Sequence, residues 1–122
     1  MGEFSPAPKK WLGDRAESLA AAYLHMAGMH ILERNYRVAR QEVDIIARDG
    51  ACLVCVEVRM RRGENCGRAA ESLTPRKRKA MREALRLVLR EFSWRGEFRL
   101  DLLALDWRAD GLGLSLEHYR GI

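Results

Sequence analysis

The sequence predicts an α/β sandwich around a mixed sheet, with the element order α-β-β-β-α-β-β. Apolar residues recur at helical spacing in two segments, 13–27 and 75–92. Two strand-like runs are joined by Asp49-Gly50, a dipeptide typical of two-residue hairpin turns. Because the second helical segment separates this hairpin from two further strands, it can serve as a crossover between strands of one sheet.

The first helix is predicted over residues 13–27, and residues 29–38 predict the first strand. Asp14 is a candidate N-cap, and Gly28 is well placed to end the helix. Residues 1–12 lack the apolar middle region of a signal peptide and predict a flexible lead-in. We therefore expect a single domain over residues 13–122.

The hairpin strands are predicted at approximately 42–48 and 51–59, followed by a polar, glycine-containing loop at 61–67. Thr74 can cap the second helix, and Pro75 suits its first turn. These signals mark the start of the second helix more sharply than its apolar periodicity does.

Two further strands complete the predicted sheet. Residues 98–107 are mostly apolar, as in a buried strand, and residues 112–119 alternate, as in an edge strand. An edge strand also offers a route to a homodimer by strand pairing.

The chain has 122 residues and a formal net charge of +5, so one core and an anionic partner fit the composition. No apolar run approaches the roughly 20 residues that span a bilayer, so we expect no membrane partner and a cytoplasmic location. A net positive charge also occurs in proteins without a nucleic-acid partner.

Three cysteines, Cys52, Cys55 and Cys66, argue against a disulfide framework because their number is odd. Cys52 and Cys55 form a CxxC, which would suit zinc or redox chemistry. Residues three apart in a strand point to opposite faces, however, so we interpret both cysteines as core residues.

Four ionisable residues interrupt the otherwise apolar hairpin: Glu42, Asp44, Glu57 and Arg59. A turn at Asp49-Gly50 would pair Arg48 with Ala51 and continue outward in steps of two. The pairs that follow are Ile46–Leu53, Asp44–Cys55 and Glu42–Glu57. Strand alternation then places Asp44, Glu57 and Arg59 on one face, with Asp44 and Glu57 as diagonal neighbours. The other face would carry the core residues Val43, Ile45, Val54, Val56 and Val58.

Carboxylates crowded on one face repel each other unless a positive group joins them, and Mg²⁺ typically takes one or two carboxylates plus waters. The hairpin therefore suggests a metal site at Asp44 and Glu57. Glu17, beside the apolar stripe of the first helix, would border the same face. The alternatives are structural ion pairs of Glu57 and Arg59 with Asp44 or Glu42, and a solvated surface role for Glu17.

Basic residues gather after the hairpin and along the second helix. The candidates for nucleic-acid contact are Arg59, Arg61, Arg62, Lys77, Lys79, Arg82 and Arg86. Lys79, Arg82, Arg86 and Arg90 follow three- and four-residue steps and form one stripe opposite the apolar face. Such a stripe suits sequence-independent phosphate contacts, and it equally suits a solubilising surface.

The motifs EVD at 42–44 and VEVR at 56–59 resemble the signature of the PD-(D/E)XK nuclease superfamily. From Gly13 to about Tyr119 the chain resembles uncharacterised protein family 0102, the YraN-like bacterial proteins. The matching elements are G-x-x-A-E at 13–17, A-x-x-Y-L at 20–24, I-L-E-R-N-Y-R at 31–37, EVDIIARDG, VEV, the glycine at 67, T-P-R-K at 74–77 and R-x-D at 99–101.

The resemblance implies a restriction-endonuclease-like three-layer α/β/α fold, similar to that of archaeal Holliday-junction resolvases. It implies Mg²⁺ or Mn²⁺ as cofactor, with Asp44 and Glu57 as metal ligands and Glu17 as a third carboxylate. The backbone carbonyl of Val58 is a further candidate ligand. The implied activity is endonucleolytic cleavage of DNA, including branched DNA, by a metal-activated water.

Two positions depart from the family pattern. Gln41 stands where glycine usually precedes E-[IV]-D, and Arg59 replaces the lysine of E-x-K. Arginine is permanently charged and cannot act as a general base, although it can hold a phosphate. Two functions therefore stay open: a metal-dependent endonuclease with Asp44, Glu57, Arg59 and Glu17 at its catalytic site, and a non-catalytic nucleic-acid-binding protein on a nuclease fold. A protein-interaction module with incidental charges is a third.

Overall fold

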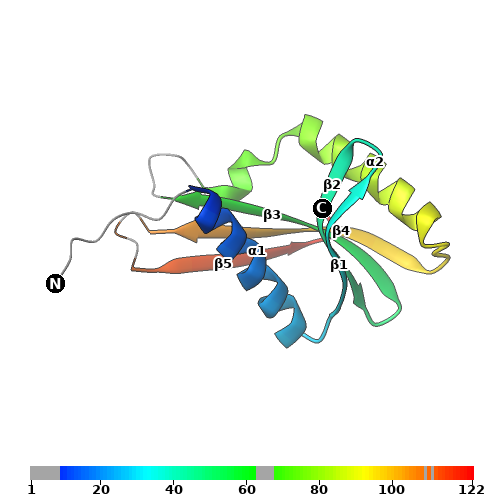
Figure 1. The fold of residues 1–122 in the computed structure, drawn as a ribbon, viewed down its shortest axis with the longest axis horizontal. Coiled ribbons are helices and arrows are strands. Elements are labelled where there is room, and N and C mark those ends of the chain that lie inside the picture. The colour runs from blue at the N-terminus through cyan, green and yellow to red at the C-terminus, as the bar shows by residue number, and fades with distance from the viewer. Residues whose placement is uncertain (1–8, 63–67, 109, 111) are drawn as a thin grey trace.

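A five-stranded mixed sheet lies between two α-helices (Figure 1). The computed structural model describes residues 9–62, 68–108, 110 and 112–122. In chain order the elements are α1 (Lys9–Met26), β1 (His30–Val38), β2 (Gln41–Asp49), β3 (Cys52–Arg62), the 3₁₀ helix η2 (Ala69–Ser72), α2 (Pro75–Glu91), β4 (Glu97–Trp107) and β5 (Leu114–Arg120). The predicted element order and the α/β/α sandwich of restriction-endonuclease type are confirmed.

The strands lie side by side in sequence order, β1-β2-β3-β4-β5. Only β3 and β4 run parallel; the other neighbours are antiparallel. Parallel neighbours need a crossover, and α2 supplies it, as the sequence predicts. Strand β5 is an edge strand, also as predicted, and β3 is the central strand of the sheet.

Both faces of the sheet are buried, one by each helix. The cluster under α1 includes Ala16, Ala20, Leu24, Ile45, Val54, Val56 and Leu103. The cluster under α2 includes Ile46, Leu53, Cys55, Met81, Ala84, Leu85 and Val88. The predicted core face is thus confirmed for Ile45, Val54 and Val56, with Val58 packed at its margin, but Val43 packs in the α2 cluster. The opposite face, which the sequence predicts to carry the charged residues, also holds buried apolar residues: Ile46, Leu53 and Cys55 pack under α2.

The cysteine interpretation agrees with this packing. Cys52 packs at the margin of the α1 cluster, and Cys55 is buried in the α2 cluster, so the two thiols lie on opposite faces. Burial raises the pKa of the Cys55 thiol to about 12, which keeps it protonated. Cys66 lies outside the described residues, as does most of the predicted loop at 61–67, of which Arg61 and Arg62 belong to β3.

The helix boundaries correct one prediction and confirm two. Helix α1 begins at Lys9, so Asp14 lies inside it and is not its N-cap; residues 1–8 of the expected lead-in lie outside the described residues. Gly28 follows the helix with a φ of 92°, a left-handed conformation that favours glycine. Thr74 caps α2, since its Oγ1 accepts a hydrogen bond of 3.1 Å from the Lys77 backbone N–H. No helix of the described chain is long and apolar enough to cross a membrane.

The hairpin register differs by two residues from the predicted one. Asp49 pairs with Cys52, so the turn residues are Gly50 and Ala51, and only Gly50 has a positive φ, as in a type II′ turn. Ile46 therefore faces Cys55, where Leu53 was expected. Because side chains alternate with a period of two, a shift of two residues does not by itself move any side chain to the other face.

A buried carboxylate anchors the far end of β4. Asp101 is fully buried and accepts hydrogen bonds from Arg99 Nε (2.9 Å) and the Gly121 backbone N–H (3.1 Å). His118 Nε2 lies 2.7 Å from its Oδ2, and His118 Nδ1 lies 2.9 Å from the Tyr23 hydroxyl. This network joins β4, β5 and α1, so it fixes the helix that carries Glu17 against the sheet.

We expect Asp101→Ala to lower the free energy of unfolding by about 3 kcal/mol, because it removes the acceptor that the half-buried Arg99 guanidinium and the buried His118 ring share. Urea denaturation at pH 7 measures the change. Asp14→Ala is the matched control, since the Asp14 side chain is exposed, and it should change stability by about 0.5 kcal/mol or less. Equal effects of the two substitutions would contradict the anchoring role.

Candidate functional site

The site begins where β2 and β3 stop pairing. Their last paired residues are Ile45 and Val56. Beyond this pair the Val58 backbone N–H donates a hydrogen bond of 2.8 Å to Asp44 Oδ2, in place of a strand partner. This contact holds the Asp44 carboxylate against β3, immediately beside Glu57.

The Asp44 carboxyl is strained electrostatically. Burial and then the charge of Glu57 raise its pKa to about 7, against the opposing effects of the Val58 hydrogen bond and of Lys77. The effect of the Glu57 charge on the pKa of Asp44 indicates that the two carboxylates lie near each other. Such a pair is costly in a metal-free protein, and perturbed carboxyls of this kind are concentrated at functional sites.

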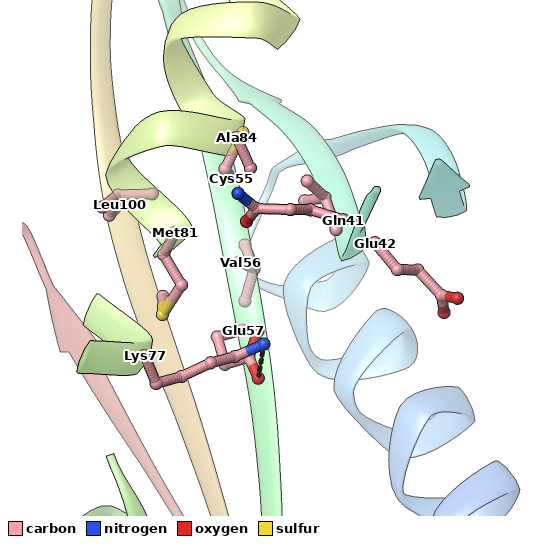
Figure 2. A pocket seen from close by; sticks show the side chains of 10 residues that line it. Gln41, Glu42, Cys55, Val56, Glu57, Lys77, Met81, Ala84 and Leu100 are labelled. Atoms are coloured by element: carbon pink, nitrogen blue, oxygen red, sulfur yellow. Dashed lines mark ion pairs between the residues drawn. The ribbon is translucent and has the colours of Figure 1, made fainter. Parts of the chain in front are cut away.

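Glu57 is almost fully buried on the central strand, with two cations beside it. Its Oε1 lies 3.6 Å from Arg59 Nη1 and 3.8 Å from Lys77 Nζ of α2. Figure 2 shows Lys77 and Glu57 meeting side by side, while the Glu42 side chain points away from them. Burial raises the pKa of Glu57, and Lys77 and Arg59 lower it. Glu57 therefore forms ion pairs with both Arg59 and Lys77.

Arg59 also contacts the segment before α2. Its Nη2 donates a hydrogen bond of 3.1 Å to the Ser72 carbonyl at the end of η2. Arg59 Nε is buried and has no hydrogen-bond partner among the described residues. The guanidinium thus links β3 to η2 as well as to Glu57.

Glu17 approaches the site from α1. Burial and then the charge of Asp44 raise its pKa, and its charge in turn acts on Glu57. Even so, among the residues that the structure describes, no three acidic, histidine or cysteine side chains form a group that could hold a metal ion. Two carboxylates suffice for Mg²⁺, whose coordination is completed by water, so the oxygen donors of Asp44 and Glu57 fit this ion.

Asn35 is a site residue that the sequence reasoning did not single out. With its amide nitrogen turned toward them, it lies 3.0 Å from Glu17 Oε2 and 3.2 Å from Glu42 Oε1. Asn35 has a φ of 50°, a conformation that asparagine tolerates better than most residues. The sequence signal that could have pointed to Asn35 is its place in the motif at 31–37. The contacts of Asn35 with Glu17 and Glu42, however, form only because the fold brings β1 beside α1.

A small pocket lies beside this pair of carboxylates, between the start of β2, the central strand and α2. Its lining includes Gln41, Glu42, Glu57, Lys77, Met81 and Leu100 (Figure 2). The pocket has room for about one water molecule. Gln41, which replaces the usual glycine of the motif, forms part of its wall.

The basic residues divide into two groups. Arg59, Arg61, Arg62 and Lys77 are half-buried near the end of β3 and the start of α2. Lys79, Arg82, Arg86 and Arg90 are exposed and form the predicted stripe on α2. Since Lys77 shares the sheet-facing side of α2 with Met81 and Ala84, the stripe lies on the opposite side of the helix from Glu57. We call these two groups the site cations and the outer stripe.

The sequence between α1 and β4 matches a known protein family. The model of the uncharacterised protein family UPF0102 matches residues 16–105. The chain belongs to this family. A UPF0102 protein of Pelotomaculum thermopropionicum is 39% identical over 91% of this chain and 93% of its own length. A UPF0102 protein of Geotalea uraniireducens is 40% identical over 93% of this chain and 90% of its own length. A match from Chlorobaculum parvum is 51% identical but covers 57% of this chain and 54% of that protein.

The UPF0102 match spans every candidate site residue, from Glu17 through Arg86. It therefore confirms the family resemblance over the whole region that forms the site. Because the family is uncharacterised, membership assigns no activity, and function has to be argued from the geometry.

The raised pKa of Asp44 predicts how stability depends on pH. The folded carboxyl binds its proton more tightly than the unfolded one, so stability is lost as the pH rises from about 4 to about 7. Asp44→Asn keeps an acceptor for Val58 and cannot ionise. In EDTA at pH 8 we expect this variant to be about 1–3 kcal/mol more stable than the native chain, with the difference shrinking toward pH 4.

Urea denaturation from pH 4 to pH 8 measures this difference. Asp14→Asn, on the exposed side of α1, is the control and should follow the native profile. Parallel profiles for Asp44→Asn and the native chain would show that Asp44 is not electrostatically strained.

Proposed function

We propose that this UPF0102 protein binds DNA and hydrolyses its phosphodiester bonds with the help of Mg²⁺ or Mn²⁺. One observation carries the proposal: the half-buried Asp44 carboxylate and the buried Glu57 carboxylate lie near each other where β2 and β3 separate, next to cationic side chains. Oxygen donors beside positive groups suit a site that must hold both a hard metal ion and a phosphate.

In this proposal Asp44 and Glu57 hold the metal, and Glu17 contributes a third negative charge from α1. The metal, when bound, polarises the phosphate and lowers the pKa of a coordinated water. The chain's own residues orient these groups: the Val58 N–H fixes the Asp44 carboxylate, and Asn35 steadies Glu17. The site cations stand where negative charge develops on the phosphate oxygens.

A second candidate function is a non-catalytic nucleic-acid-binding protein on the same fold. The observation in its favour is Arg59, which occupies the position of the motif lysine and is engaged by the Ser72 carbonyl. A guanidinium held in this way can contact a phosphate, but it cannot take a proton from water. With this function the protein binds DNA without producing a cleaved product.

Cleavage assays separate the two functions. We expect the native chain to cleave branched, single-stranded or linear DNA in Mg²⁺ or Mn²⁺, and we expect Asp44→Asn and Glu57→Gln to reduce the rate at least about 100-fold. Gel assays with and without EDTA measure the products, and calorimetry with Mn²⁺ measures metal binding independently of activity. Cleavage that survives both substitutions would remove the catalytic proposal, whereas activity only in Arg59→Lys would favour the second function.

The outer stripe predicts a separable effect on affinity. A Lys79→Ala/Arg82→Ala/Arg86→Ala variant should bind DNA more weakly at every sequence tested. The slope of log K against log salt should become shallower by about 0.9 for each phosphate that the variant no longer neutralises. Fluorescence anisotropy across a salt series measures both quantities. A control variant, Glu33→Ala/Glu83→Ala, removes exposed acidic residues and should not lower the affinity. An unchanged salt slope in the triple variant would exclude the stripe as a phosphate-binding surface.

A further inference from the structure

Two cations lie within ion-pair distance of the buried Glu57 carboxylate, and they are not equivalent. Arg59 comes from the same strand, two residues along, and Lys77 comes from the first turn of α2. We propose that Lys77, and not Arg59, contacts the attacking water and the scissile phosphate in this site. The inference rests on the proposed hydrolytic function and assigns to α2 the residue that the strand motif lacks.

The Arg59 side chain already makes two contacts within the protein. Its guanidinium spans the Ser72 carbonyl of η2 and the Glu57 carboxylate, at 3.1 Å and 3.6 Å. Its side chain does not line the pocket beside Glu57. A group held between two fixed partners has little freedom to follow a reacting phosphate, so Arg59 serves to tie β3 to the segment that leads into α2.

Lys77 has the opposite arrangement. Its backbone N–H binds Thr74 Oγ1, so the helix start that carries it is fixed by the N-cap and by Pro75. Its side chain lies on the same side of α2 as Met81 and Ala84, and it lines the pocket together with Glu57. A fixed backbone and a flexible four-carbon stem place a compact ammonium beside the Glu57 carboxylate in the pocket lining (Figure 2).

The positive charge of Lys77 acts on the carboxylates of both Asp44 and Glu57. The Lys77 ammonium lies 3.8 Å from Glu57 Oε1, and its charge lowers the pKa of Asp44 as well as that of Glu57. Lys77 and Glu57 both line the pocket, which has room for about one water molecule.

The proposed step is ordinary phosphodiester hydrolysis. The water oxygen forms a bond to phosphorus, and the bond from phosphorus to the leaving ester oxygen breaks with its electron pair remaining on that oxygen. The proton lost by the water passes to solvent, and the leaving oxygen takes a proton from solvent. Throughout, the Lys77 ammonium donates hydrogen bonds to the water oxygen and to a phosphate oxygen, where negative charge accumulates.

The experiment uses the full chain with the DNA substrate that the native protein cleaves. Lys77→Met should lower kcat about 100-fold while DNA affinity changes by no more than about twofold. Arg95→Met is the matched control: it removes an exposed cation between α2 and β4, outside the proposed site and the outer stripe, and should keep native kcat. Thermal unfolding verifies that both variants fold, which the backbone cap of α2 favours.

A rescue variant separates a chemical role from a structural one. Adding Arg59→Lys to Lys77→Met returns an ammonium beside Glu57 from the strand, and it should restore kcat at least about tenfold over Lys77→Met alone. Native kcat in Lys77→Met, or loss without any rescue, overturns the assignment while the proposed hydrolysis stands. Absence of cleavage by the native chain overturns the proposed hydrolysis, and the assignment with it.

Discussion

The hydrogen bond from the Val58 backbone N–H to the Asp44 carboxylate is the contact on which the site depends. A buried N–H needs a partner, and β2 stops supplying main-chain partners to β3 after the Ile45–Val56 pair. Asp44 meets this demand with its side chain, so the strands can separate without leaving the N–H unsatisfied. The separation in turn opens the space in which Asp44 and Glu57 face each other and α2 brings in Lys77.

Three carboxyl groups in this fold are removed from solvent to different degrees, and they differ in how many partners compensate their charge. Asp101 is fully buried, yet Arg99, His118 and the Gly121 N–H surround it, and it serves to join β4, β5 and α1. Asp44 and Glu57 have fewer compensating partners, and burial raises the pKa of each. A protein that retains such a pair on two neighbouring strands holds free energy that a bound cation would release. The contrast favours the hairpin, and not the Asp101 network, as the site of the proposed chemistry.

The sequence predicted the fold because its helices, strands and turns carry local signals. Strand alternation also predicts Asp44, Glu57 and Arg59 on one face, and a register shift of two residues does not by itself change that prediction. The Val43 prediction was wrong because strict alternation does not hold where β2 separates from β3 while it stays paired with β1. The contacts of Lys77 with Glu57 and of Asn35 with Glu17 were beyond reach, since each joins elements far apart in the chain. Their distances follow from how α1 and α2 cover the sheet, which no motif encodes.

The division of the basic residues has a consequence for how DNA would engage the protein. The outer stripe lies on the solvent side of α2, whereas Glu57 lies beneath the sheet-facing side of the same helix. One flat contact cannot cover both, so in the proposed function the stripe would act through its field and through phosphates remote from the reacting one. The proposed affinity and the proposed chemistry would then reside on opposite sides of one helix. The first turn of α2 connects the outer stripe to the side of the helix that faces Glu57. In this turn Thr74 and Pro75 set the position of Lys77.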